Sequence, residues 1–196
     1  MYEVEATGGL LLMVEQSPRA ATNPAAERGA YVSLVEAVQD GDREAFGQLY
    51  KLYAPMVHGI LLARVPFDEV DDLVQDVFLL AFKKLHTLRD NAAFGGWLAM
   101  ITRNHAMNFH RRTHLSEELT EDMARTDSTA SEAREVLSII RSLPDAYRET
   151  LILRLVEGMT GPEIAERTGL MPDSVRVNLH RGMKLLREKL RGEERI

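Results

Sequence analysis

The segment from Thr160 to Arg191 constrains the fold of this 196-residue chain more than any other segment. It begins with the capping-box pattern Thr-x-x-Glu, in which a hydroxyl and a carboxylate each accept a hydrogen bond from an open backbone N–H at a helix start. Gly169 can adopt a positive φ at low cost and so end a short helix. Pro172 suits the first turn of a further helix, because its missing N–H would be unpaired there. The segment therefore predicts a helix, a glycine turn and a second helix.

The second of these helices would carry two different faces. Ile164 and Ala165 of the first helix should face inward, and the second helix has an apolar stripe made by Val175, Leu179, Leu186 and Leu190. From Ser174 to Arg191 there are six Lys or Arg residues and one Glu. A recognition helix needs this division, since one face packs while the other contacts phosphates and base edges. The alternative is an amphipathic surface helix with a solvated basic face, but the capped helix and the glycine turn before it favour a DNA-binding helix-turn-helix.

The pattern of apolar residues predicts that the rest of the chain is also helical. Apolar residues recur at helical spacing from Tyr31 onward, and no stretch alternates with period two, so the predicted fold class is all-α. Residues 116–132 contain six acids and one Arg, a composition typical of a linker. The sequence therefore predicts two small helical domains, 31–114 and 132–192, joined by a flexible acidic linker over 115–131. Residues 1–30 have no sustained period and predict a disordered or loosely packed extension, with either Met1 or Met13 as its true start.

Pro55 is expected to kink or break the second helix of the first domain. A later helix should run from about Ala92 to Arg112. Its expected apolar residues are Phe94, Trp97, Leu98, Ile101 and Met107.

Composition excludes several functions. The chain has no Cys, which rules out disulfides, thiol redox sensing and Cys-ligated zinc. It contains no Gly-rich phosphate loop, Gly-x-Ser-x-Gly or His-Glu-x-x-His motif, so we expect neither enzymatic activity nor a cofactor. His110 and His114 lack an evident third ligand, so no metal site is expected. The apolar run Leu10–Val14 is far shorter than the roughly 20 residues of a membrane span, and acids rather than bases precede it, unlike a secretory signal. A cytoplasmic protein without membrane insertion is expected.

A strongly acidic helix is expected after Pro66. Residues 68–76 contain five acids and no base, although the net charge of the whole chain is only −6. Once apolar residues have taken the core stripe, five side chains remain toward the outside: Asp71, Asp72, Gln75, Asp76 and Leu79. A charge run on a helix is most often only a solvated face, but an exposed Leu79 among acids favours a surface that binds a partner.

The segment Leu88–Arg112 combines aromatic rings with cations. A polar loop precedes a helix whose second half is basic, with no acid in that half: Arg103, His105, His110, Arg111, Arg112 and His114. Flat rings stack on bases while cations follow phosphates, so the pattern suits melted or single-stranded nucleic acid. The alternative assigns Phe94 and Trp97 to the core.

Together these segments resemble a known family. DDLVQDVFLLAFKK resembles the polymerase-docking helix of bacterial sigma factors, FGGWLAMITRNHAMNFHRR resembles their promoter-melting helix, and Leu143–Leu190 is similar to the domain that reads the upstream promoter element. The two-domain layout, without intervening domains, matches the extracytoplasmic-function (ECF) class, and the resemblance covers about Leu34–Leu190. It implies a transcription initiation factor whose partners are core RNA polymerase (its β′ clamp helices and β flap), promoter DNA and an anti-sigma factor.

The resemblance also implies a role for each segment. In this reading 31–114 is sigma region 2 and 132–192 is sigma region 4. The five outward side chains of the acidic helix would bind polymerase: Asp71, Asp72, Gln75, Asp76 and Leu79. Residues implied at the −10 element are Arg89, Asp90, Asn91, Arg103, Asn104, Asn108, Arg111 and Arg112. Residues implied at the −35 element are Ser174, Arg176, Val177, Asn178, His180, Arg181 and Lys184. The alternative is a stand-alone helix-turn-helix regulator with an N-terminal sensor domain, which has no reason to carry the Asp72–Arg112 segment.

The sequence departs from the family pattern at three places. The resemblance implies that the loop at residues 88–93 holds a base flipped out of the −10 element. Residues 88–91 read Leu-Arg-Asp-Asn where Phe-Arg-Gly is commoner, so which base this loop would hold stays open. Gly95-Gly96 replaces bulkier residues and costs the helix about 1 kcal/mol per Gly relative to Ala. Val177-Asn178 stands where Ser-Arg is frequent, which should change the preferred upstream sequence.

Overall fold

The structure is a computed structural model that describes residues 24–116 and 128–193. Within those residues every regular element is a helix, which confirms the all-α prediction. The α-helices are α2 (Pro24–Gln39), α3 (Arg43–Leu62), α4 (Val70–Lys84), α5 (Phe94–Ser116), α6 (Ser128–Arg141), α7 (Asp145–Leu155), α8 (Gly161–Thr168) and α9 (Pro172–Glu193). Three short 3-10 helices lie at η1 (Phe67–Glu69), η2 (Leu85–Thr87) and η3 (Asn91–Ala93).

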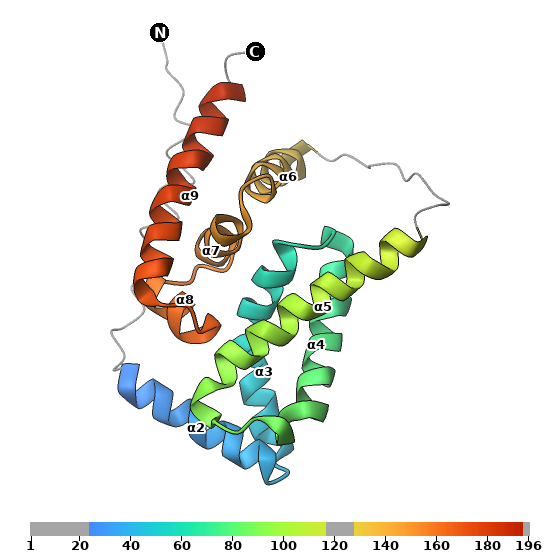
Figure 1. Ribbon diagram of the computed structural model, residues 1–196, viewed down its shortest axis with the longest axis vertical. Coiled ribbons are helices and arrows are strands. Elements are labelled where there is room, and N and C mark those ends of the chain that lie inside the picture. Colours follow the sequence, from blue (N-terminus) through green and yellow to red (C-terminus); the bar gives the residue numbers. More distant parts are fainter. Residues whose placement is uncertain (1–23, 117–127, 194–196) are drawn as a thin grey trace.

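Helices α2 to α5 form the N-terminal helical unit, in which α3 is central. The start of α3 is fixed by Asp42, whose side chain accepts hydrogen bonds from the backbone N–H groups of Glu44 at 2.8 Å and Ala45 at 3.1 Å. Helices α2, α4 and α5 pack on α3, and α5 crosses α3 and α4 in Figure 1. This packing buries Met56 and Leu98 completely.

Helices α6 to α9 form the C-terminal helical unit, and its helix-turn-helix is built as the sequence predicts. The Glu163 N–H donates to the Thr160 hydroxyl at 3.3 Å, while the Thr160 N–H donates to the Glu163 carboxylate at 2.8 Å, which completes the capping box. Gly169 ends α8 with φ of 72°, and α9 begins at Pro172. Ile164 is fully buried and Val175 nearly so, which confirms that both face the core.

Several predicted boundaries were wrong. Helix α2 begins at Pro24 rather than Tyr31, because Pro suits the first turn and the Ala-rich residues after it favour a helix. Helices α5 and α6 extend to Ser116 and from Ser128, so they occupy both ends of the predicted linker, and residues 117–127 lie outside the described part of the chain. Helix α3 continues through Pro55. The burial of α3 against three neighbouring helices outweighs the one hydrogen bond that Pro removes.

The two units pack directly on each other. Helix α7 contacts α3, and α8 contacts both α3 and α5, an arrangement visible at the centre of Figure 1. The buried side chains of both units form one continuous cluster. Nothing in the periodicity of the sequence predicted this contact.

The capping box offers a direct test of how the helix-turn-helix is held. Replacing Thr160 with Ala leaves the Glu163 N–H without its acceptor, so we expect the free energy of unfolding to fall by about 1 kcal/mol. The measurement is urea unfolding followed by helical circular dichroism. Thr160→Ser keeps the hydroxyl and serves as the control. Equal losses in both variants would show that the methyl group, not the cap, matters.

Candidate polymerase and nucleic-acid interfaces

The five side chains predicted to bind polymerase share one exposed surface of α4, the acidic face. All five, from Asp71 to Leu79, are exposed, and Leu79 is 58% exposed. The opposite side of the helix buries Val70 and Val77 in the core, so the stripe pattern places the acids outward. The Asp76 carboxylate lies 3.8 Å from the ring of His105 on α5.

The sequence interpretation missed one member of the acidic face. Phe82 is 47% exposed and lies one turn beyond Leu79, so both extend the same surface. Its ring makes an edge contact with Phe46, with the ring centroids 4.9 Å apart. The three-residue spacing from Leu79 was the signal that could have identified it. The acidic face therefore has an apolar end of two large side chains.

Helix α5 presents a mixed surface to solvent, the outer face of α5. Its members are spaced at i, i+4, i+7, i+8 and i+11, and all are exposed: Met100, Asn104, Met107, Asn108 and Arg111. Met107, one of the apolar residues expected in this helix, is 61% exposed. Met100 is 52% exposed, and the sequence interpretation did not identify it as part of a surface. Arg112 is exposed beside this face.

Arg103 does not join the outer face of α5. Its guanidinium donates two hydrogen bonds to the Glu149 carboxylate of α7, at 3.1 Å from Nε and 2.7 Å from Nη2. Arg64 pairs with the same carboxylate at 2.6 Å. Burial alone would raise the pKa of Glu149, but Arg103 and Arg64 together hold it below its ordinary value. The buried carboxylate is therefore ionised between two cations.

The loop before α5 forms a hydrogen bond within itself. Arg89 and Asp90 are exposed and Asn91 is half-buried. The Asp90 carboxylate accepts a hydrogen bond from the Ala92 N–H at 3.0 Å and so caps η3. Of the three, Asp90 has a local structural role, while Arg89 is open to solvent.

Most of the α9 residues that the resemblance implies at the −35 element are exposed to solvent. Six are exposed and Asn178 is half-buried; the exposed ones are Ser174, Arg176, Val177, His180, Arg181 and Lys184. Arg176 pairs with Asp173 at 3.2 Å, and Lys184 pairs with Glu188 at 3.9 Å. Exposed pairs of this kind contribute little to stability, so both cations remain available to phosphates or bases.

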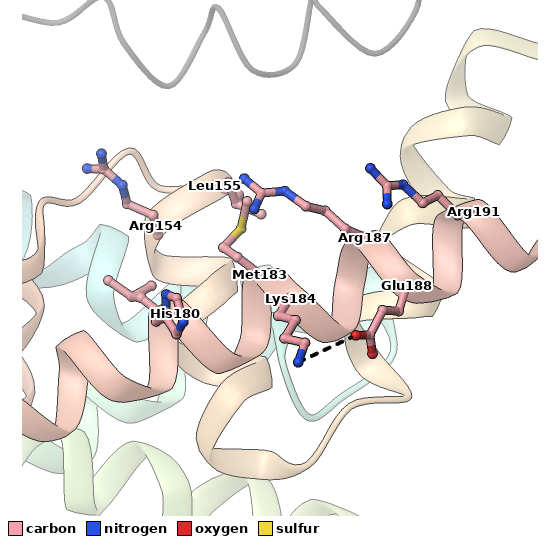
Figure 2. A pocket seen from close by; sticks show the side chains of 9 residues that line it. Arg154, Leu155, His180, Met183, Lys184, Arg187, Glu188 and Arg191 are labelled. Carbon is pink, nitrogen blue, oxygen red and sulfur yellow. Dashed lines mark ion pairs between the residues drawn. The ribbon is translucent and has the colours of Figure 1, made fainter.

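A groove runs along one side of α9, with a volume of about 660 Å³. Its floor is apolar and its rim basic, as Figure 2 shows, where Met183 lies between the cations of Arg154 and Arg187. The full lining is Arg154, Leu155, Leu179, His180, Met183, Lys184, Arg187, Glu188 and Arg191. The sequence interpretation missed Arg154 and Leu155, because α7 brings them to α9 from outside the helix-turn-helix.

Residues 24–116 and 128–193 contain no group of three His, Cys, Asp or Glu side chains placed to hold a metal ion. The His110 ring instead lies 2.6 Å from the backbone oxygen of Arg64, and the side chain of His114 lies outside the described residues. No helix in these ranges has both the length and the apolar character needed to cross a membrane.

The fold and its surfaces define an all-helical helix-turn-helix protein with a separate exposed acidic face on α4. Residues 49–115 match the family model described as Sigma-70 region 2, and residues 133–186 match Sigma-70, region 4. The ECF RNA polymerase sigma-E factor of Haemophilus influenzae is 30% identical over 177 residues, which cover 81% of this chain and 94% of that protein. RNA polymerase sigma factor CarQ of Myxococcus xanthus is 32% identical, covering 80% and 95%.

The fold agrees with a solved structure of the same kind. CnrH, in complex with the cytosolic domain of CnrY, is 26% identical with a TM-score of 0.61, covering 83% of this chain and 98% of CnrH. The chain therefore belongs to the sigma-70 family, in its extracytoplasmic-function class.

A histidine lies in the contact between the two units. The His58 ring on α3 lies 2.6 Å from the Glu157 carboxylate, which follows α7. The hydrogen bond to Glu157 raises the pKa of His58; burial opposes this, and the charges of Glu157 and Asp71 add to it. Because the folded-state pKa is raised, the stabilisation is complete below the ordinary value of about 6.5 and is lost as pH rises through the folded-state value.

We expect this pair to make stability depend on pH. The difference in unfolding free energy between the wild type and His58→Gln should be largest below about pH 6.5 and should shrink as the solution becomes alkaline. Urea unfolding at a series of pH values measures it. His86→Gln removes an exposed histidine on η2 and is the control. A His58→Gln profile parallel to that of the wild type would contradict the assignment.

Proposed function

We propose that each surface described above has one task in transcription initiation. As a sigma factor, the chain binds core RNA polymerase and directs it to promoters. The acidic face of α4 would dock on the β′ clamp helices. The loop at residues 88–93 and the outer face of α5 would engage the −10 element, and the exposed side of α9 would read the −35 element. The observation that carries this proposal is that three chemically distinct surfaces fall inside the two matched sigma regions.

The outer face of α5 has the chemistry that melted DNA requires. Asn104 and Asn108 offer amide donors and acceptors, Arg111 offers a phosphate contact, and Met100 and Met107 offer apolar surface to exposed bases. Met100 and Met107 are two large apolar side chains exposed on one helix face, which supports a contact with DNA.

The groove beside α9 supports a protein contact on the C-terminal unit. Its apolar floor and basic rim fit an acidic amphipathic helix, and we propose that the β flap of polymerase uses it. The CnrH structure holds the cytosolic domain of CnrY, and we propose that an anti-sigma factor binds this chain as well. Acting on polymerase, the chain would work in the cytoplasm and without a catalytic site of its own.

The stand-alone regulator is not favoured. Its N-terminal domain would sense a ligand, whereas residues 49–115 match sigma region 2. The acidic face and the outer face of α5 both lie within that match. A sensor domain gives no reason for either surface.

The test of this function is promoter-specific run-off transcription with purified core polymerase. The wild-type chain should give discrete transcripts that core enzyme alone does not give. Replacing Asp72 and Asp76 with Lys reverses the charge of the acidic face and should weaken core binding at least tenfold, roughly 1.4 kcal/mol. Glu36→Lys with Asp40→Lys makes the same charge change on and just after α2, away from the acidic face, and should leave core binding intact. Equal weakening in both double variants would rule out a specific docking face.

The two cations of α9 should differ in a −35 library. Arg can pair with guanine through two hydrogen bonds, worth about 1–3 kcal/mol of discrimination, so Arg176→Ala should relax the preference at one upstream position. A phosphate contact carries no sequence information, so Lys184→Ala should weaken all promoters alike. Sequencing of transcripts from a randomised −35 region measures both. If both variants return the wild-type motif at lower yield, α9 contacts only the backbone.

A further inference from the structure

One large apolar side chain is exposed to solvent just before the helix that would read the −35 element. Met171 is 71% exposed, more than any other large apolar side chain of the described residues. It lies between α8 and α9, in the turn of the helix-turn-helix. Leu170, its neighbour in the same turn, is half-buried against the core. Leu170 therefore anchors the turn, and Met171 adds little to the packing.

Met171 also occupies a position at which methionine does not stabilise a helix. The Val175 N–H donates to the Met171 backbone oxygen at 3.0 Å, and α9 begins at the next residue, so Met171 is the N-cap residue of α9. Ser, Thr, Asp and Asn are preferred there, because their side-chain oxygens accept a hydrogen bond from the backbone of the first turn. A thioether is only a weak acceptor. The stability of the fold therefore does not explain a methionine at this position, and residues that break a local rule often serve function.

A second apolar side chain lies on the same strip of α9. Val177 is 38% exposed and follows Met171 by six positions. Ser174 lies between them, three residues from each, and Arg181 follows Val177 by four residues; both are exposed. Side chains three or four positions apart are neighbours on a helix surface, while Val175 is buried on the other side. The exposed strip therefore alternates apolar with polar side chains.

The chemistry of the DNA major groove indicates what these two apolar side chains would contact. The N-terminal part of a recognition helix meets base edges there. Most groups on those edges are hydrogen-bond donors or acceptors, which Ser174 and Arg181 can match, and the C5-methyl group of thymine is the apolar one. The groove that we assign to a protein partner lies elsewhere on α9, since neither Met171 nor Val177 lines it. The two side chains therefore fit base pairs whose edge carries a methyl group.

We propose that Met171 and Val177 are specificity-determining residues that read the C5-methyl groups of thymines in the −35 element. The proposal rests on the function proposed above, in which α9 reads that element, and it adds the base that two of its residues select. Six residues span about 9 Å along a helix at 1.5 Å per residue, more than the 3.4 Å between successive base pairs. The two side chains would therefore contact different thymines, and the −35 motif that the wild type selects should hold at least two fixed T·A pairs.

The test replaces single thymines by uracil in run-off transcription with purified core polymerase. Uracil keeps the hydrogen-bonding groups of thymine and lacks only its C5-methyl group. The starting promoter carries the −35 element that the wild-type chain selects from the randomised library, and each thymine of either strand is replaced in turn. With the wild type, two of these replacements should each raise the promoter concentration for half-maximal run-off about fourfold, the equivalent of about 0.8 kcal/mol for one buried CH₂ group.

Three variants assign the two sensitive thymines to their residues. Met171→Ser removes the apolar chain and places a preferred N-cap residue at the start of α9, so its effect cannot come from loss of the helix. It should abolish the uracil effect at one thymine only. Val177→Ser introduces the residue that is frequent at this position in the family and should abolish the effect at the other thymine. Met171→Leu keeps an apolar side chain and should retain both effects, which separates methyl contact from a general need for methionine.

Two results would overturn the proposal. One is a wild type whose transcription is indifferent to uracil at every −35 thymine, although whole base-pair replacements there reduce it; α9 would then read the element through polar contacts alone. The other is a uracil effect at both thymines that persists unchanged in either serine variant. Failure of the proposed function would look different, because whole base-pair replacements in the −35 element would then leave transcription unchanged as well.

Discussion

The buried carboxylate of Glu149 is the interaction on which the arrangement of the two units depends. An ionised carboxylate out of water is costly unless charges and hydrogen bonds compensate it. Here the compensation comes entirely from the other unit, through Arg64 and Arg103. Glu149 can therefore be both buried and ionised only where the two units pack together.

The glycines at the start of α5 also allow the two units to pack together. Gly weakens a helix by roughly 1 kcal/mol relative to Ala, so a pair of them needs a compensating gain. The gain is access, because Gly95 lets the backbone of α5 reach the backbone of Arg167 with no side chain between them. Gly169 has two roles at once: its φ of 72° ends α8, and its bare Cα receives Gly96. The turn of the helix-turn-helix is thereby also part of the contact between the units.

Much of the local structure followed from the sequence. The capping box at Thr160, the turn at Gly169 and the outward acids of α4 were predictable because each depends on residues a few positions apart. The boundary errors at Pro24 and Ser128 arose where helix propensity continues past the last clear apolar stripe. The exposure of Met107 could not be predicted, because spacing identifies an apolar residue of a helix without saying whether a neighbouring helix covers it.

The contacts between residues far apart in the sequence could not be predicted in this way. Arg103 and Glu149 are 46 positions apart, and Arg141 and Leu62 are 79 apart. Periodicity shows which side of a helix is apolar, but not which helix will pack there. The polar side chains that join the two units therefore looked like solvent-exposed charge in the sequence. Arg103 was the clearest case, since it was grouped with cations whose side chains point elsewhere.

The charge distribution of the chain disfavours DNA binding by the free chain. DNA affinity comes largely from neutralised phosphates, yet the chain carries a net charge of −6. The cations of α9 face solvent, but Arg103 cannot add to them, because it already has the Glu149 carboxylate as its partner. An acidic face on α4 further repels phosphates while attracting a basic protein surface. The free chain should therefore bind polymerase before it binds DNA.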